Sequence, residues 1–571
     1  MKAQVMLWLL VACLAGGLNA GDKLYQERLY EPKVLWGDKL SAFYGYPVNE
    51  IYLYAWDEAQ QSWRMMPYQI DERIRTNNPF NDENLRHFYS IPNSYGIALD
   101  DGLLDSDDEL VFMIKDMGDR APEKKWLDNE ASKAFSRIEL AASDPYDPSR
   151  IAYAYLFRSG TIQEPVPTPY GFVYHSQADS IETSFYTVKL DEAMGLVKSI
   201  TIKPPYGSGV DIFDRQKMRV KVVLGAGGLT NIQIDATEEL IKLLPDYHMI
   251  TPKPVVRLVR EVRQTFQFGE GMEEVESNLA FYLTTKFYPF NGVVKGGSAL
   301  DEASLRQAMP DWDNPFLLFE LLRQSWDLSA AAAGMRYYSK HNDGILIDGQ
   351  PDDVNRQIDR PIREWNLVTG PQGALFTMTT LPDTVAESIS LYYYDNQAGG
   401  TGDPDSLEFV DTGEDGSYGD FGLSMYKAKS LDLAFEMYFL PNTVNSAEQA
   451  AAIARVVEKP VDITPLVTAV DRRPVLTAPE SYLCVQNYPN PFNQQTVISF
   501  SLAAAEQVQV TIYDSQGRLI RTLVQTTLAA GSHELSWDGC DRHNRALASG
   551  VYFYQLTAGD QIARNKLLLL R

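Results

Sequence analysis

The side chains in this sequence whose types and spacing best suit chemistry are carboxylates crowded into one short acidic segment. Calcium takes about six to eight oxygen ligands, and a run of aspartates and glutamates can supply several of them. No frame of the segment has the spacing of an EF-hand loop, and a solvated turn before a strand explains the same composition. Beside that simpler interpretation we name a candidate calcium site, with these ligands: Asp100, Asp101, Asp105, Asp107, Asp108 and Glu109.

A pair of carboxylates is the second chemistry that the sequence offers. Glycoside hydrolysis needs two of them roughly 5–10 Å apart across a sugar. With 76 acidic residues the sequence singles out no pair, although Asp71, Glu72 and Asp313 are candidate members. Tyrosines at 337–338 and 392–394 can stack on sugars, but strand alternation favours sheet packing. No H-E-x-x-H or G-x-S-x-G motif occurs, so catalytic residues are unknown and the question of enzymatic activity stays open.

The charge distribution narrows the range of partners. The chain has 571 residues and a net charge of −25, while the Lys/Arg and Asp/Glu residues from 475 to the end balance. Nearly all of the negative charge therefore lies before residue 475. Such a surface repels nucleic acid and anionic membranes, and it suits neutral glycans, cations or basic partners. High solubility is a sufficient explanation of the same charge.

The N-terminus predicts export. Lys2 precedes an apolar run at 5–15 that is too short to cross a bilayer, and Ala20 offers a cleavage site. We therefore predict a signal peptide at 1–20 and passage through the periplasm. Lipidation of Cys13 is an alternative, because residues 10–13 fit a lipoprotein box. No later run is long and apolar enough for a membrane-spanning helix.

The residues after the signal peptide predict a mainly β body at 21–458, of one or two subdomains. Segments at 255–268 and 274–287 read as a long hairpin, and strands of this length suit a large β-sandwich. A few helices are expected as interruptions. Asn314-Pro315 predicts a helix at 316–324, and Ser446 with Gln449 forms a capping box for an alanine-rich helix ending near Glu458.

Proline spacing sets off the C-terminal end of the chain. Prolines recur between 459 and 481, which we assign to a linker. Beyond it, apolar and polar residues alternate at 497–502 and 508–512, and turn residues separate the strands. About seven strands in some ninety residues predict an immunoglobulin-like β-sandwich at 482–571.

This C-terminal region resembles a known family through several motifs in one order. They are Asn487 to Asn493, Ile512-Tyr513-Asp514 with Gly517-Arg518, Trp537-Asp538-Gly539, Gly550-Val551-Tyr552, and Lys566 to Arg571. Together they resemble the type A C-terminal sorting domain of the type IX secretion system, related to the Ig-like domain of flagellar hook-capping proteins.

The resemblance implies where the protein goes. It implies export by the outer-membrane secretion machinery to the cell surface or the medium. The residues that carry the signal would be Gly550, Tyr552, Lys566, Leu567 and Arg571. A passive Ig-like spacer is the alternative function for the same fold.

Two further expectations concern the whole chain. After signal removal only Cys484 and Cys540 remain, and export permits a disulfide between them, although the sequence does not show that they meet. For the body we carry two hypotheses. One is a glycan-binding or glycan-processing module whose partner is a polysaccharide. The other is a non-enzymatic surface or adhesion protein stabilised by calcium, the only cofactor considered.

Overall fold

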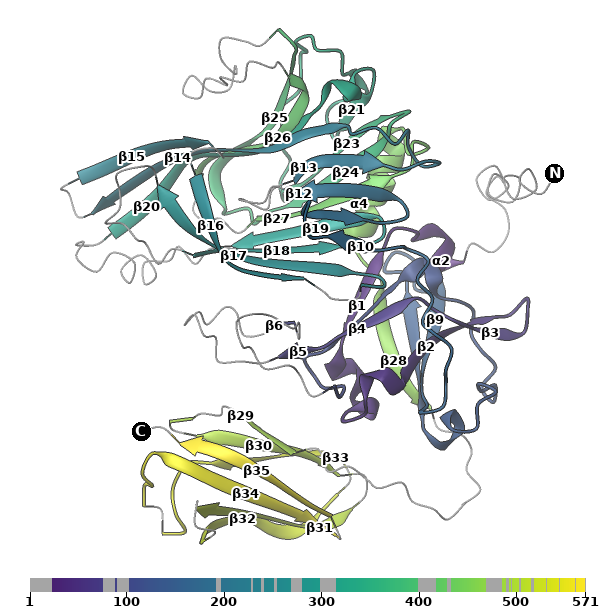
Figure 1. Cartoon of the computed structure of the whole chain (residues 1–571), viewed down its shortest axis with the longest axis vertical. Helices are drawn as coiled ribbons and strands as arrows, with labels where there is room; N and C mark the ends of the chain where they lie inside the picture. The colour runs from purple at the N-terminus through teal and green to yellow at the C-terminus, as the bar shows by residue number, and fades with distance from the viewer. Residues whose placement is uncertain are drawn as a thin grey trace. The chain divides into compact units, whose positions relative to one another are not determined.

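The structure is a computed structural model of the whole chain (Figure 1). The chain divides into two compact units. Unit 1 comprises Met1–Leu40, Val48–Gly102 and Ser106–Thr468, and unit 2 comprises Ser41–Pro47, Leu103–Asp105 and Ala469–Arg571. We call unit 1 the body and Ala469–Arg571 the C-terminal module. The residues described are 23–74, 88–89, 102–190, 197–226, 230–237, 241–250, 254–268, 280–297, 315–398, 417–428, 433–468, 485–488, 492–493, 495–502, 505–514, 518–529, 531–543, 545–559 and 561–569.

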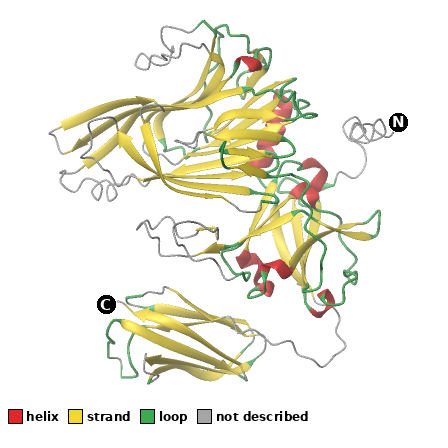
Figure 2. Ribbon diagram, viewed as in Figure 1, coloured by secondary structure: helices red, strands yellow, loops and turns green. Residues whose placement is uncertain are grey.

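Strands dominate the described residues, which confirms the predicted fold class (Figure 2). The largest sheet of the body has nine antiparallel strands. In spatial order they are β16 (Ile241–Ile250), β17 (Leu258–Phe268), β18 (Ala280–Phe287), β19 (Asn291–Gly297), β27 (Leu433–Leu440), β24 (Gly373–Thr380), β23 (Arg363–Gly370), β21 (Arg336–Ser339) and β22 (Ile345–Leu346). The pairing of β17 with β18 confirms the predicted hairpin. Its turn lies outside the described residues.

Two smaller sheets pack against the nine-stranded sheet. One contains β15 (Thr230–Thr237), β14 (Phe213–Ala226), β20 (Pro315–Leu328), β26 (Ser417–Ala428) and β25 (Ala386–Asn396). The other contains β10 (Val173–His175), β11 (Ser180–Glu182), β12 (Tyr186–Leu190) and β13 (Val197–Ile202). Trp326 of the first meets Phe435 of β27, with ring centroids 5.3 Å apart, and Tyr186 of the second meets Phe439 at 4.2 Å. One buried apolar core thus lies between the layers of a large sandwich.

The body also contains two sheets from the N-terminal third of the chain. A three-stranded sheet has the order β1 (Pro32–Trp36), β7 (Glu109–Met113) and β4 (Tyr68–Asp71). A five-stranded sheet has the order β28 (Asp462–Thr468), β8 (Arg137–Ser143), β9 (Ile151–Arg158), β2 (Ile51–Asp57) and β3 (Ser62–Met65). The residues at 462–468, which we assigned to the linker, therefore form a strand of the body. Seven residues of β28 pair with β8, which accounts for this difference despite the prolines.

The helix predicted at 316–324 is wrong, because these residues lie within strand β20. Local capping signals favour a helix there, but β14 pairs with β20 on one side and β26 on the other. Leu321 and Leu322, which face opposite sides of this central strand, are both almost fully buried. Pairing on both edges and burial on both faces outweigh a weak local propensity.

The helix predicted after Ser446 is confirmed as α4 (Ala447–Glu458). The Ser446 hydroxyl accepts a hydrogen bond from the Gln449 amide, and the Gln449 side chain accepts one from the Asn445 amide. The first bond satisfies an N–H group that the first turn of a helix leaves without a partner, and the second fixes the backbone just before the helix. The only other α-helix among the described residues is the short α2 (Leu24–Glu27). Neither described helix is long enough to cross a bilayer.

The C-terminal module is a seven-stranded Ig-like sandwich, as the sequence predicts. One sheet has the order β29 (Val485–Tyr488), β30 (Thr496–Leu502) and β33 (Gly531–Trp537). The other has the order β32 (Leu519–Leu528), β31 (Glu506–Asp514), β34 (Gly550–Ala558) and β35 (Gln561–Leu569). Ile498, Phe500, Val508, Val510 and Ile512, the apolar positions of the alternating pattern, are buried between the sheets.

Candidate functional sites

Three of the recognised C-terminal motifs meet in the core of the module. Phe492, from the first motif, packs on Trp537 with ring centroids 5.4 Å apart. Trp537 in turn contacts Tyr552 edge-on at 5.6 Å. The Tyr552 hydroxyl donates a hydrogen bond to the Ala548 carbonyl, and the Trp537 indole N–H donates one to the Cys540 carbonyl. The motifs are therefore linked by one aromatic chain inside the fold.

The predicted signal residues divide between the core and the surface of the module. Gly550 is the first residue of β34 and is half-buried, while Tyr552 and Leu567 point into the core. Lys566 is exposed on β35, opposite Phe553. Arg571 lies outside the described residues. The recognition role of these residues stays a prediction, because their packing shows only what holds the fold.

The predicted disulfide also stays a prediction. Cys484 lies outside the described residues. Cys540 is half-buried in the module, and its thiol lies 3.7 Å from the Asp538 carbonyl oxygen.

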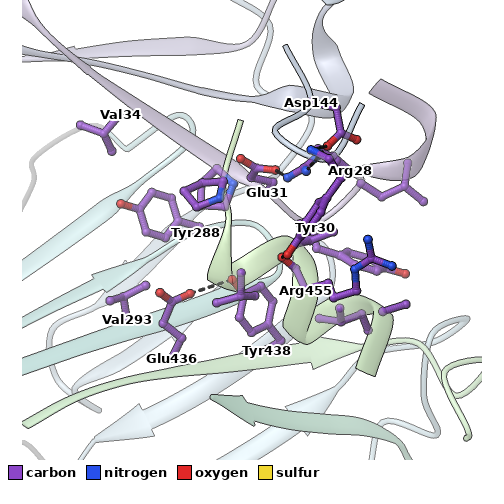
Figure 3. A pocket seen from close by; sticks show the side chains of 18 of the residues that line it. Arg28, Tyr30, Glu31, Val34, Asp144, Tyr288, Val293, Glu436, Tyr438 and Arg455 are labelled. Carbon is purple, nitrogen blue, oxygen red and sulfur yellow. Dashed lines mark hydrogen bonds and ion pairs between the residues drawn. The ribbon is translucent and has the colours of Figure 1, made fainter. Parts of the chain in front are cut away.

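The body contains a pocket of about 800 Å³ (Figure 3). Its walls come from segments that are far apart in the sequence. They are the N-terminal stretch through β1, Glu109 of β7, the loop after β8, strands β18, β19 and β27, and helix α4. Tyr30, Tyr288 and Tyr438 line the cavity together with aliphatic side chains of β19 and α4. A concave, largely apolar site with a few polar groups is the usual form of a small-molecule site.

One wall of the pocket is a pair of cross-strand rows on the nine-stranded sheet. Lys286 lies opposite Val293, which lies opposite Glu436. All three line the pocket, so an ammonium and a carboxylate flank an apolar centre, roughly 10 Å apart at the backbone. The neighbouring row contains Asn291 opposite Tyr438. Side chains two positions apart on a strand share a face, so both rows face the cavity side of the sheet.

The two polar side chains of the second row, Tyr438 and Asn291, differ in their hydrogen bonding. The Tyr438 hydroxyl donates to Glu436 Oε2 at 2.7 Å. Burial, reinforced by Glu436, raises the pKa of Tyr438 well above its usual value, so the phenol stays neutral. Asn291 is fully buried, and neither its amide oxygen nor its amide nitrogen has a hydrogen-bond partner in the part of the chain that is described. A buried amide in that state is costly to the fold.

The N-terminal stretch forms the opposite wall through an ion-pair triad. Arg28 bonds Glu31 at 2.7 Å and Asp144 at 2.9 Å, and all three residues are buried. Glu31 also accepts a hydrogen bond from the Val461 amide. Burial raises the pKa of the Glu31 carboxyl, and Arg28 offsets part of that effect. The triad fixes the stretch that places Tyr30 over the cavity (Figure 3).

A second charge cluster reaches the pocket through Glu109 and Lys286, which both line it. The Arg257 guanidinium contacts both Asp71 and Glu109, which are directly paired across β4 and β7. Arg73 and Lys286 lie 3.2 Å and 3.9 Å from Glu109. Burial alone would raise the pKa of Glu109, but Arg257, Lys286 and Arg73 together lower it to about 2. Glu109 is therefore an ionised anchor at neutral pH.

This cluster defines what the predicted acidic residues do in the structure. Among the candidate calcium ligands, Asp107, Asp108 and Glu109 are buried and Asp105 is half-buried, while Asp100 and Asp101 lie outside the described residues. Asp108 accepts a hydrogen bond from the Arg73 amide. No group of three or more His, Cys, Asp or Glu side chains converges as a metal site within the described residues. Calcium binding by this segment stays a prediction.

The carboxylates considered for glycoside hydrolysis do not form a described pair in the pocket. Asp71 is buried against Arg257, Glu72 is half-buried outside the pocket lining, and Asp313 lies outside the described residues. Tyr337, Tyr392 and Tyr393 are almost fully buried, so they pack in the body and offer no sugar platform.

The sequence did not lead us to the residues that line the pocket. Lys286 and Tyr288 at the end of β18 and Glu436 and Tyr438 on β27 are each a charged residue followed two positions later by tyrosine. That spacing puts both side chains on one face of a strand. The sequence signal for the pocket was therefore a charged side chain and a tyrosine on one face of an otherwise apolar strand.

Comparison with known proteins supports the Ig-like fold of the C-terminal region. The family described as FlgD Ig-like domain matches residues 487–561, which run from β29 to the first residue of β35. The C-terminal region is thus similar to that domain. No curated protein matches the chain.

Solved structures show only weak likenesses. Dimeric latent PorU from Porphyromonas gingivalis is 11% identical, with 74% of this chain and 36% of that chain covered and a TM-score of 0.15. PorZ, a surface component of the type IX secretion system of the same organism, is 12% identical, with coverage of 76% and 51% and a TM-score of 0.12. The EFF-1 ectodomain from C. elegans is 8% identical, with coverage of 67% and 87% and a TM-score of 0.11. The chain spans about a third of PorU and half of PorZ.

Proposed function

We propose that this is an exported binding protein whose C-terminal module is its sorting signal for a type IX-like secretion route. The observation that carries the proposal is the FlgD Ig-like match at 487–561, on a module whose recognised motifs join in one aromatic core. The protein would pass through the periplasm and reach the cell surface or the medium. Its first partner would be the secretion machinery of the outer membrane.

Deletion of residues 485–571 tests the sorting role in the producing bacterium. We expect the truncated protein to stay in the periplasm, while the full chain is found outside the cell. The body has its own core, and β28 closes its last described sheet before the deletion begins, so the body should still fold. Unchanged export of the truncated protein would refute the sorting role and leave the module as a spacer.

For the body we propose that the pocket binds a saccharide. The half-buried Tyr30 offers an aromatic ring at the cavity, and the Lys286–Val293–Glu436 row offers a hydrogen-bond donor and an acceptor on either side of an apolar centre. Sugars present the matching combination of apolar ring faces and hydroxyl groups. A cavity of this size suits the end of a polysaccharide chain better than an extended chain.

Binding fits the geometry better than hydrolysis. A glycosidase needs one carboxyl group that carries a proton near neutral pH. Glu109 is held ionised by Arg257, and both oxygens of Glu31 are engaged, by Arg28 and by the Val461 amide. Glu109 and Glu31 therefore anchor the wall, and Glu436, the carboxylate of the sheet row, accepts a hydrogen bond from Tyr438.

A glycan array with the full chain, with and without calcium, tests saccharide binding. We expect binding that falls at least about tenfold in Val293→Arg, which fills the centre of the wall with a long charged side chain. Val467→Arg is the matched control, because Val467 is exposed on β28 outside the pocket. Equal melting temperatures would show that both variants fold. The proposal fails if no glycan binds in either condition, or if Val293→Arg binds as well as the parent chain.

A further inference from the structure

One face of the C-terminal module carries a cross-strand row of unusual composition. In the sheet β32–β31–β34–β35, Leu519 lies opposite Tyr513, Tyr513 opposite Phe553, and Phe553 opposite Lys566. The adjacent positions Ile512, Tyr554 and Leu567 are fully buried in the core. Because side chains alternate along a strand, this row, which we call the Phe553 row, faces away from the sandwich.

The exposed apolar side chains of the module gather at this row. Leu519 is 57% exposed, Phe553 41% and Val551 38%, and Val551 lies opposite Leu568 one step further along β34 and β35. No other large apolar side chain among the module's described residues is that exposed. The solvated face of an antiparallel sheet is normally polar, and exposed apolar side chains that cluster across strands mark a contact surface.

The charges on this face all have one sign. Arg564 and Lys566 are exposed on β35, and β32, β34 and β35 contain no acidic residue. The acidic residues of β31 stand at its two ends. Asp514 is largely buried and bonded to Arg518, opposite core-facing Tyr552, and Glu506 lies at the far end. The face therefore has an apolar centre with a cationic edge.

We propose that the Phe553 row is a docking surface for a partner protein of the export machinery that presents an apolar patch bordered by carboxylates. The inference deepens the proposed sorting role and rests on it. Charge complementarity identifies the partner's chemistry: acidic groups would pair with Lys566 and Arg564 while Phe553, Val551 and Leu519 are buried. Of the four predicted signal residues that the structure describes, Lys566 is the exposed member that reaches this surface, and Tyr552 and Leu567 hold the strands beneath it.

Other occupants fit this face less well. A lipid surface is usually recognised by about four to eight clustered lysines and arginines, and this face has two. A second copy in a two-fold arrangement would place cationic edge residues on both sides with no carboxylate between them. An acidic partner protein satisfies both the apolar centre and the charged edge.

Export of surface variants tests the proposal in the producing bacterium. The variants are Phe553→Ser and Lys566→Glu in the full chain, with Lys566→Arg as the conservative variant. Matched controls in the body are Leu466→Ser, which removes another half-exposed apolar side chain, and Lys198→Glu, which makes the same charge change at an exposed site. The melting temperature of each purified chain shows whether the fold is kept.

We expect extracellular protein to fall about tenfold or more in Phe553→Ser and Lys566→Glu, the scale expected when a central anchor is lost. Lys566→Arg and both controls should be exported like the parent. Normal export of folded Phe553→Ser or folded Lys566→Glu would overturn the docking surface. The two proposals separate through the deletion of 485–571. If the deletion stops export but the point variants do not, only the docking surface fails, whereas normal export after the deletion removes the sorting role too.

Two measurements on purified full chain exclude the other occupants. Flotation with vesicles containing phosphatidylglycerol should show no binding that depends on Phe553. Sedimentation should show no self-association that Phe553→Ser removes. Phe553-dependent binding to vesicles would overturn the proposal in favour of a lipid surface, and Phe553-dependent dimerisation would overturn it in favour of a second copy.

Discussion

Glu109 accepts a hydrogen bond from Arg257 at 2.5 Å although the two residues are 148 positions apart in the chain. The contact ties β7 of the three-stranded sheet to the residue that precedes β17 of the nine-stranded sheet. Gln69 strengthens the same junction, because its side-chain oxygen accepts hydrogen bonds from the amides of Val255 and Val256. Polar contacts thus join the three-stranded sheet to the segment that leads into β17.

The first prediction concerns the pH dependence of this junction. The pKa of Glu109 is about 2 in the folded protein and near 4.5 in an unfolded chain. A lowered folded pKa stabilises the protein above the unfolded pKa, and that stability is lost as pH falls from about 4.5 towards 2. The full loss should be on the order of 3 kcal/mol, of which about 2 kcal/mol is lost by pH 3. Denaturant unfolding of the parent and Glu109→Gln between pH 6 and pH 3 measures it. A stability difference between the two that does not shrink with falling pH would contradict this origin.

The second prediction separates Arg257 from its partners. Arg257→Leu leaves two buried carboxylates without their guanidinium, so it should destabilise the body by about 3–5 kcal/mol. Adding Asp71→Asn and Glu109→Gln should recover much of that loss, because the buried negative charges are then gone. Urea unfolding of the single and triple variants measures both effects. If the triple variant is less stable than Arg257→Leu alone, repulsion between the carboxylates is not the cause.

The sequence predicts the C-terminal module well and the body only in outline. In the module, short strands alternate strictly and turns separate them, so local pattern and final fold agree, as at Val508, Val510 and Ile512. Strand β20 shows where local reasoning fails. Its capping signal at Asn314-Pro315 is genuine chemistry, but pairing with β14 and β26 decides the outcome.

The pocket could not be predicted because its residues come together only through long-range contacts. Arg28 donates a hydrogen bond to the Lys459 carbonyl, 431 positions away, and Glu31 accepts one from the Val461 amide. No sequence spacing encodes these meetings. The face shared by Lys286 and Tyr288, or by Glu436 and Tyr438, was readable on each strand separately. The sequence did not show that β19 lies between β18 and β27 and so brings the two faces together.

The third prediction concerns Asn291, whose buried amide lacks partners among the described residues. Asn291→Leu has a similar size and removes the unsatisfied polar atoms, so it should raise the stability of the body by about 1–2 kcal/mol. Asn342→Leu is the matched control. The Asn342 amide bonds Ser339 and both backbone groups of Asn355, so its loss should destabilise the body by a similar amount. Thermal unfolding of both variants checks the pair, and a destabilised Asn291→Leu would show that the amide is satisfied in solution.

The last prediction asks whether the export signal is a folded surface or a string of residues. Tyr552→Phe keeps the ring against Trp537 and loses the hydrogen bond to Ala548, so the module should lose about 1 kcal/mol and remain folded. Trp537→Ala removes the centre of the aromatic chain and should cost about 3–5 kcal/mol, enough to unfold a small sandwich.

If the machinery reads the folded module, Tyr552→Phe is exported normally and Trp537→Ala is retained in the periplasm. Trp537 is fully buried and was not among the predicted signal residues. Its replacement can therefore change export only by unfolding the module. Calorimetry of the two purified chains gives the stability of the module, and the extracellular fraction gives export. Normal export of a Trp537→Ala chain whose module is unfolded would show that the motifs act as a linear signal, because their residues would then work without the core that joins them.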